Sequence, residues 1–333
     1  MALPVPRDPL ARFLDIATAL ADEKRWWENR TILRYAALPL VLAPGEPAQV
    51  AARAAERGRT LAAQSSWFGD LRGAMCWVIA ALLAADGRDA AQSGEEIAAV
   101  RARFHHAGVR RGGAYELVAA TMLHLAGRTS DRDVQRLRDV YEGMKRHHWW
   151  LTGPEDLPAC ALLTVHGGEL AQLSLRIEGL YARLRSAGLA AGDGLQMASH
   201  VLCLARGGED QLAARFLELH RGFLDQHIRM WDSDRDELAL LCLLDEPAAR
   251  TAARVVEHRA QIRARLAKVG PTASFSFACG TAWLAAHAGE TLEPPLDRDV
   301  QIANLAMATN AARALQQDQA AAAGASASAS ASF

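Results

Sequence analysis

A pattern with a period of about 40 residues recurs along this chain. Three copies end alike, with an apolar residue, a second apolar residue four positions later, and a glycine or histidine four positions after that. These copies begin at Val100, Val140 and Leu180. Glycine at the last position suits the left-handed conformation in which many helices end. A fixed period of this length predicts stacked helical units, because each unit buries its apolar face against its neighbours.

Each period also contains a second segment that is more apolar than the first. These segments span residues 71–83, 116–125, 157–165, 195–204, 237–244 and 275–284. Good helix formers dominate the chain, and alternating Val or Ile patterns typical of strands are almost absent. The sequence therefore predicts an all-α fold, built as an α-solenoid-like array of antiparallel helix pairs. Each pair combines a buried helix with an amphipathic one and takes about 40 residues, near the lower edge of the HEAT and armadillo range.

Polar residues between the helices predict where helices begin and where the domain ends. A hydroxyl residue followed three positions later by an acid predicts helix starts at Ser93, Ser130 and Thr152. Residues 1–29 are predicted to form an N-terminal helix that caps the array, and residues 30–319 the helical-repeat domain. The Ala/Ser-rich segment 320–333 has the low complexity of a disordered tail. The pattern leaves open whether the array stays extended or closes into a ring.

Composition excludes several classes of protein. The chain of 333 residues is 50% hydrophobic with a formal net charge of −1, which is too apolar for disorder and too weakly charged for bulk attraction to nucleic acid or anionic membranes. The longest apolar run, 74–85, is shorter than the roughly 20 residues of a membrane-spanning helix. With no secretory signal pattern and no paired cysteine motif, we expect a cytoplasmic protein. We expect its single cysteines to pack as small core residues in the buried helices: Cys76, Cys160, Cys203, Cys242 and Cys279.

Several stretches resemble a known family. Trp149–Leu163 and Gly188–Leu202, with the shorter pieces Leu33–Leu38 and Ser66–Arg72, are similar to the bacterial family called domain of unknown function 4003. The resemblance extends over roughly residues 10 to 290, but it implies no catalytic residue because the family has no established activity. The stretch Leu180–Leu189 also resembles the end of a pentatricopeptide repeat, which implies single-stranded RNA as an alternative partner.

One buried helix carries an unusual polar stripe. If a helix begins at Asp193, then Gln196, Ser199 and His200 share a face at spacings of three and four residues. Such a stripe suits a pocket or groove, and a buried hydrogen-bonded network between helices is the alternative interpretation. Ser199 and His200 are adjacent and point apart on a helix, so they do not form a nucleophile–base pair by themselves.

The aromatic pair Trp149 and Trp150 is a second candidate ligand site. Two adjacent indoles suit a clamp for a peptide or a base, while packing at the end of a helix is the structural alternative. No HExxH motif, dinucleotide fingerprint, phosphate-binding loop or nucleophile elbow occurs. The sequence therefore predicts no catalytic residue, no cofactor and no metal site.

Three functions remain compatible with these patterns. The first is a non-enzymatic scaffold that binds another protein or a peptide on a concave surface, because stacked helix pairs form extended grooves. The second is an RNA-binding repeat protein. The third is an enzyme with a pocket near Gln196 and His200. We expect a protein or peptide partner and no membrane, with nucleic acid as the alternative.

Overall fold

A computed structural model describes residues 3–23, 29–64, 74–148, 153–166, 168–292 and 296–330. Side chains are described over the same ranges except for 3, 64, 146–148, 296–297 and 321–330. The described chain is helical apart from turns, loops and one short strand pair, β1 (Leu3–Pro4) with β2 (Thr291–Leu292). The predicted all-α class is confirmed.

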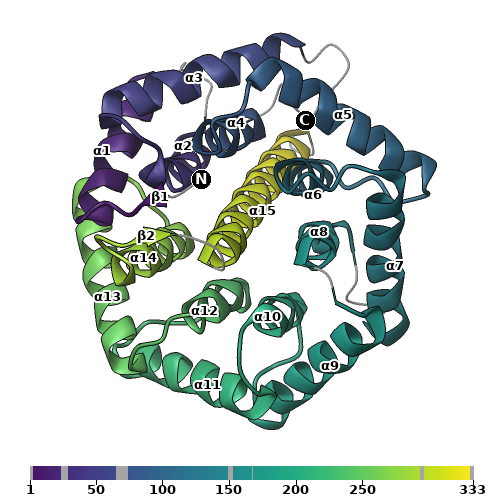
Figure 1. Cartoon of the computed structure of the whole chain (residues 1–333). Helices are drawn as coiled ribbons and strands as arrows, with labels where there is room; N and C mark the ends of the chain where they lie inside the picture. The colour runs from purple at the N-terminus through teal and green to yellow at the C-terminus, as the bar shows by residue number, and fades with distance from the viewer. Residues whose placement is uncertain are drawn as a thin grey trace.

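Figure 1 shows the helices as two concentric layers that form a ring. The outer layer contains α1 (Pro9–Asp22), α3 (Pro47–Gln64), α5 (Ala90–His106), α7 (Asp131–His148), α9 (Leu170–Ser186), α11 (Glu209–Asp225) and α13 (Ala248–Arg265). The inner layer contains α2 (Arg30–Ala37), α4 (Met75–Ala85), α6 (Ala114–Leu125), α8 (Leu157–His166), α10 (Asp193–Leu204), α12 (Arg235–Leu241) and α14 (Pro271–Ala286). Short 3-10 turns lie at η1 (Pro39–Leu42), η3 (Pro154–Asp156) and η4 (Asp232–Asp234). Helix α15 (Leu296–Ser330) crosses the space that the inner layer encloses.

The two layers follow from the two kinds of segment in each period. Met75–Leu83 of α4 is buried at every position, as expected for a helix between the outer layer and α15. The outer helix α9 buries only one stripe, formed by Ile177, Leu180 and Leu184. The predicted apolar segments coincide closely with the inner helices. All five cysteines are buried there or at an inner-helix end, which confirms their predicted place in the core.

The predicted helix starts have different outcomes. Ser130 forms the predicted capping box, because Asp133 N–H donates to Ser130 Oγ (3.3 Å) and Ser130 N–H donates to Asp133 Oδ2 (3.2 Å). The start predicted at Ser93 is wrong. Helix α5 begins earlier because the Asp89 carboxylate accepts a hydrogen bond from Gln92 N–H (2.8 Å), which leaves Ser93 inside the helix and beside His124. Thr152 lies outside the described residues.

The predicted left-handed glycines occur at the ends of two outer helices. Gly108 and Gly188 have φ angles of 76° and 94°. The next residue in each case closes the helix end, as in the hydrogen bond from Val109 N–H to Phe104 O (2.9 Å). These bonds account for two of the repeated helix endings in the sequence.

An arginine on the outer helix recurs as a second mark of the period. Arg176 of α9 donates hydrogen bonds to the carbonyl oxygens of Cys203 (3.0 Å), Ala205 (2.9 Å) and Gly207 (2.9 Å), just where α10 ends. A cation there complements the free carbonyls and the negative end of the helix dipole. Matching bonds link Arg12 to Val41, Arg57 to Arg88, Arg136 to Gly168, Arg215 to Leu244 and Arg254 to Ala282.

The ring closes where the first helix meets the last pair. Helix α1 contacts α13 and α14, and Phe277 of α14 packs against Phe13 (centroids 5.5 Å apart) and Tyr35 (4.7 Å). The strand pair joins Leu3 to Leu292 at the same junction. Helix α1, predicted as a cap within residues 1–29, thus lies in the outer layer, and α15 continues past the boundary predicted at residue 320. Helix α15 contacts the inner helices α2, α4, α6, α8, α12 and α14.

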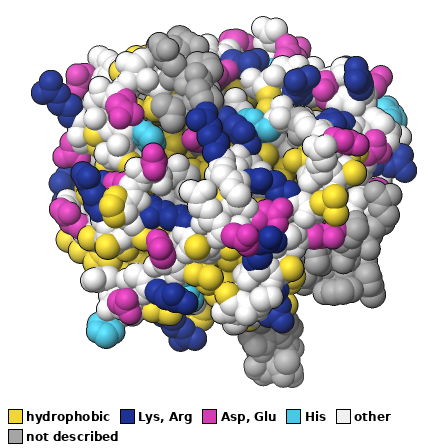
Figure 2. All heavy atoms as spheres, turned by 60° about the horizontal axis from the view of Figure 1, so that its bottom comes forward, with side chains coloured by type: hydrophobic (Ala, Val, Ile, Leu, Met, Phe, Trp, Pro, Cys, Tyr) yellow, Lys and Arg dark blue, Asp and Glu magenta, His cyan; other side chains and the backbone are white. Residues whose placement is uncertain are grey.

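One face of the molecule is mixed in charge. On the face in Figure 2, Lys and Arg side chains lie among Asp and Glu side chains, without the continuous basic track expected of an RNA-binding face. None of the helices in the described part of the chain combines the length and apolar character needed to cross a bilayer.

Candidate functional site

The first turns of α8, α10 and α12 lie together at one end of the ring. A hydrogen bond joins Gln196 of α10 to Asp156 before α8, and another joins Gly194 of α10 to Asp232 before α12. Helix α15 brings Arg313 to the same place, where it contacts Asp236. We name this end the acidic mouth; it comprises Glu155, Asp156, Asp193, Gln196, Asp232, Asp236, Glu237, Asn310 and Arg313.

Asp156 is a carboxyl group of the acidic mouth whose pKa is strongly raised. It is 3% exposed, and its oxygens accept hydrogen bonds from Gly153 N–H (3.0 Å) and Gln196 Nε2 (3.3 Å). Burial raises its pKa to about 8, the Gly153 bond opposes this change, and the charges of Glu155 and Asp193 add to it. The carboxyl group therefore carries a proton at neutral pH.

The neighbours of Asp156 fit a protonated carboxyl group. Gln196 Oε1 and the Tyr141 hydroxyl are both buried, and neither has a hydrogen-bond partner in the described chain. The amide orientation of a glutamine is assigned rather than observed, because its oxygen and nitrogen have nearly the same shape. With the Gln196 amide turned, a protonated Asp156 can donate a hydrogen bond to Gln196 Oε1.

Arg313 organises the other half of the acidic mouth. Its guanidinium donates hydrogen bonds to Asp236 Oδ2 (3.3 Å) and Ser233 O (3.1 Å), and it also reaches the side-chain oxygen of Asn310. Asn310 in turn donates to Glu237 Oε1. Burial and then the charge of Asp236 raise the pKa of Glu237 well above its usual range. Asp236 Oδ1 and Glu237 Oε2 remain without hydrogen-bond partners among the described residues.

Exposed carboxylates form the rim of the acidic mouth. Asp193 and Asp232 are both exposed, and the Arg313 side chain is 24% exposed. Burial and then the charge of Asp232 raise the pKa of Asp193. Asp232 Oδ2 accepts a hydrogen bond from Gly194 N–H (2.9 Å). A Cβ atom on Gly194 would lie 1.8 Å from the Asp232 carbonyl oxygen, so this approach requires glycine.

An aromatic side chain stands beside this rim. Trp231 directly precedes Asp232 and is 42% exposed, which is unusual for so large an apolar side chain. The Arg229 guanidinium lies over its ring, 3.9 Å from the centroid. An exposed indole next to carboxylates offers an apolar face and hydrogen-bond acceptors to the same ligand.

The residues proposed from the sequence have different positions. Asp193 and Gln196 lie in the acidic mouth. Ser199 is buried and donates to Leu195 O of its own helix (2.9 Å), and His200 is buried one turn beyond Gln196. Trp149 and Trp150 lie outside the described residues. The ligand-binding roles of these residues remain predictions.

Several residues of the acidic mouth were missed by the sequence reasoning. Asp156 and Glu237 occupy the position of Gln196 in the preceding and the following period. Each is a polar residue directly before an apolar run, and Glu116 is another. Aligning the periods on this position would have found them. Arg313 gives no such signal, because it lies outside the repeated pairs.

The arrangement is suited to proton transfer. A buried carboxyl group with a raised pKa lies near an exposed one, and two carboxyl groups in different environments can act as acid and base. No three His, Cys, Asp or Glu residues converge as a metal site within the described ranges. The class defined by fold and site is a closed ring of helix pairs with a central helix and an acidic mouth.

Comparison with known proteins assigns a family. The chain belongs to the family described as "Protein of unknown function (DUF4003)", whose model matches residues 20–266. It is 29% identical over 126 residues to an uncharacterised protein, YeaA, of Bacillus subtilis (strain 168), a match that covers 38% of each chain. The matched stretch thus spans well under half of that relative. No solved structure gives a significant match. The matched family region contains Asp156, Gln196 and Glu237, whereas Arg313 lies beyond it.

Proposed function

We propose that this protein hydrolyses an uncharged, hydroxyl-rich substrate at the acidic mouth, with Asp156 as proton donor and Asp193 as proton acceptor. The observation that carries the proposal is the proximity of a buried carboxyl group that holds its proton to an exposed one at the same opening. The proposal develops the alternative of an enzyme with a pocket near Gln196.

The chemistry of the acidic mouth favours hydroxyl groups as ligands. Protonated carboxyl groups, the Gln196 amide and the Tyr141 hydroxyl can each donate and accept hydrogen bonds, as sugar hydroxyls do. The exposed face of Trp231 suits the apolar side of a sugar ring. A cationic ligand is a poorer match, because Arg313 already occupies the centre of the carboxylates.

A glycosidic bond is a linkage that two carboxyl groups can cleave without a further nucleophile. Asp156 would give its proton to the leaving oxygen as the bond between carbon and oxygen breaks. Asp193 would take a proton from the attacking water, whose oxygen joins the carbon. Asp193 then releases its proton to solvent and Asp156 regains one from solvent, so each cycle consumes one water molecule and no net proton.

The test measures new reducing ends after incubation of the full chain with neutral α- and β-linked oligosaccharides. We expect Asp156→Asn and Asp193→Asn each to lower the rate by about a hundredfold or more, the usual contribution of a general acid or base. Asp131→Asn is the matched control, because the Asp131 side chain is 92% exposed on α7. The proposal would be contradicted if none of the oligosaccharides were cleaved or bound saturably. It would also be contradicted if all three variants lost the same fraction of the cleavage rate.

The finer description of the fold is a proposal of the same kind. We propose that the helix pairs are solenoid-like antiparallel units of a common length, and the recurring arginines Arg136, Arg176 and Arg215 support this. A protein or peptide partner remains a prediction.

A further inference from the structure

A second polar region lies at the opposite end of the ring. Helix α10 runs from Asp193 at the acidic mouth to Leu204, and α15 runs in the other direction, from Arg298 to Arg313. Fifteen residues of helix separate these two arginines, which corresponds to about 22 Å. A cavity of about 1050 Å³ opens at the Leu204 and Arg298 end. It is therefore separate from the acidic mouth.

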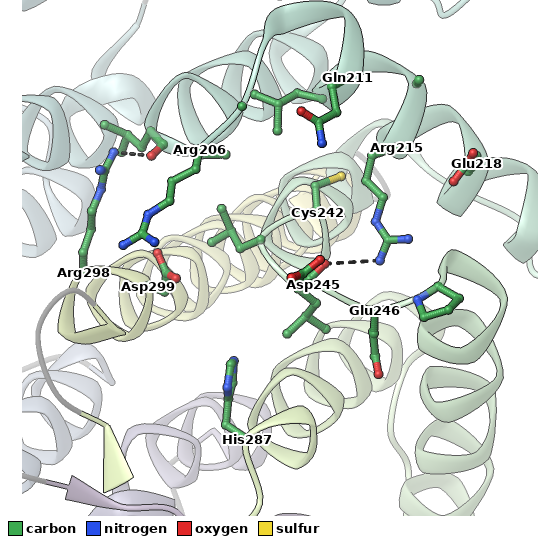
Figure 3. Close-up of a pocket in the computed structure, with 18 residues that line it drawn as sticks. Arg206, Gln211, Arg215, Glu218, Cys242, Asp245, Glu246, His287, Arg298 and Asp299 are labelled. Carbon is green, nitrogen blue, oxygen red and sulfur yellow. Dashed lines mark hydrogen bonds between the residues drawn. The ribbon is translucent and has the colours of Figure 1, made fainter. Parts of the chain in front are cut away.

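The cavity is large enough for a metabolite and has two chemically distinct walls. Arg206, Arg298 and Asp299 lie together on one wall, and Arg215 and Asp245 lie on the other (Figure 3). The volume matches pockets that hold small molecules, commonly about 300–1,000 Å³. Such a cavity, with charged groups on facing walls, suits a ligand whose two ends differ in charge.

The first wall is built to meet an anion. Arg298 donates a hydrogen bond to Leu204 O, which holds its guanidinium at the cavity, while its buried Nε has no hydrogen-bond partner among the described residues. Arg206 is exposed on the loop after α10. Neither arginine forms a direct ion pair with Asp299 in the described contacts, although their charges act on it. Burial raises the pKa of Asp299, and the charges of Arg298 and Arg206 oppose this change.

The second wall supplies acceptors for hydroxyl or amino groups. The Arg215 guanidinium on this wall donates hydrogen bonds to Leu244 O (3.5 Å) and Thr251 Oγ1 (3.4 Å), so it is already engaged within the protein. Glu246 is engaged by Arg254 at 2.6 Å. Asp245 lies at the cavity beside them.

From the cavity and its paired guanidinium groups we infer that this end of the ring binds a small phosphate monoester, with the phosphate held by Arg206 and Arg298 and hydroxyl or amino groups facing Asp245. Two guanidinium groups from separate elements can each donate hydrogen bonds to phosphate oxygens. A carboxylate is small enough for one fork, so the second arginine favours phosphate. The site is independent of the proposed hydrolytic function.

Calorimetric titration of the full chain tests the site with inorganic phosphate, glycerol 3-phosphate and glucose 6-phosphate, against sulfate at equal ionic strength. We expect saturable binding of the phosphates, tighter for the esters, and a loss of about tenfold in Arg206→Gln. Arg229→Gln is the matched control, because it removes one exposed positive charge from the region of the acidic mouth. Arg206→Gln removes no hydrogen bond that the described chain makes, so its folding should be unchanged.

Each outcome supports or contradicts phosphate binding in the cavity. Loss of phosphate affinity in Arg206→Gln with retention in Arg229→Gln supports it. The inference fails if no phosphate binds up to about 50 mM, a concentration well above the dissociation constant of roughly 1 mM that marks weak binding. It also fails if sulfate binds as well as the esters, or if the two variants lose affinity equally. Asp156→Asn should leave phosphate binding unchanged, which separates this result from the fate of the hydrolytic proposal.

Discussion

Replacement of Asp156 by asparagine should stabilise the protein. The folded protein holds the Asp156 proton up to a pKa of about 8, whereas the unfolded chain releases it near 3.8. Between these values the folded state binds more protons than the unfolded state, so the stability of the native protein falls as the pH rises. Asparagine keeps the shape and can bond both Gly153 and Gln196, but it never ionises.

The size of the effect follows from the same two pKa values. Each pKa unit corresponds to about 1.36 kcal/mol, so the gain in unfolding free energy is roughly 4 kcal/mol at pH 7 and largest above pH 8. Asp156 is 3% exposed, so solvent screening reduces this little. Below about pH 4 the variant and the parent should have the same stability, because both carry a neutral side chain.

Urea unfolding at several pH values between 4 and 8.5 measures this difference. The midpoint for Asp156→Asn should rise above that of the parent progressively with pH. Asp131→Asn should show a small difference without this rise, because Asp131 is exposed. A variant that is less stable than the parent at pH 8, or a difference that does not depend on pH, would refute the reasoning that Asp156 is protonated in the folded protein.

Three further predictions concern the contacts of Arg313, Arg176 and Gly194. Arg313→Met should lower the unfolding free energy by about 3 kcal/mol at pH 7, because Asp236 is left buried without its cation. In the same urea assay, the double variant with Asp236→Asn should recover part of this loss. Arg176→Ala should lower the unfolding free energy by about 2 kcal/mol through the loss of its charged hydrogen bonds, measured as a lower thermal midpoint. An unchanged midpoint would contradict the stabilising role given to the repeated arginines. Gly194→Ala should lower the unfolding free energy by about 3 kcal/mol, because the added carbon forces the 231–234 turn away. Gly58→Ala should raise the unfolding free energy by roughly 0.5–1 kcal/mol, because its added carbon meets only ordinary contacts. Equal effects of the two glycine replacements would be inconsistent with the close approach at Asp232.

Local features of the fold could be predicted from the sequence because they depend on neighbouring residues. The apolar segments 116–125 and 157–165 coincide with α6 and α8, and Gly108 and Ser130 act at helix ends as their chemistry requires. Ring closure could not be predicted. It depends on contacts such as that of Phe13 with Phe277, which lie at opposite ends of the chain and leave no periodic signal.

The candidate site was predicted only in part, for a related reason. The polar stripe on α10 indicated Asp193 and Gln196, because helical spacing alone places them near one another. The pKa of Asp156 depends on burial between neighbouring pairs, which spacing does not report. Asn310 and Arg313 come from a helix that crosses the ring and meets α12, which lies far from it in the sequence. Such contacts are properties of the closed ring rather than of any one period.

The central claim is that Asp156 carries a proton at neutral pH inside the acidic mouth. The most direct measurement is the pH titration of its carboxyl carbon by NMR in the folded protein, with the signal assigned by comparison with Asp156→Asn. The structure predicts a titration midpoint near pH 8, well above the 3.8 of an ordinary aspartate. A midpoint near 4 would contradict the account, because Asp156 would then be ionised at neutral pH and unable to donate a proton.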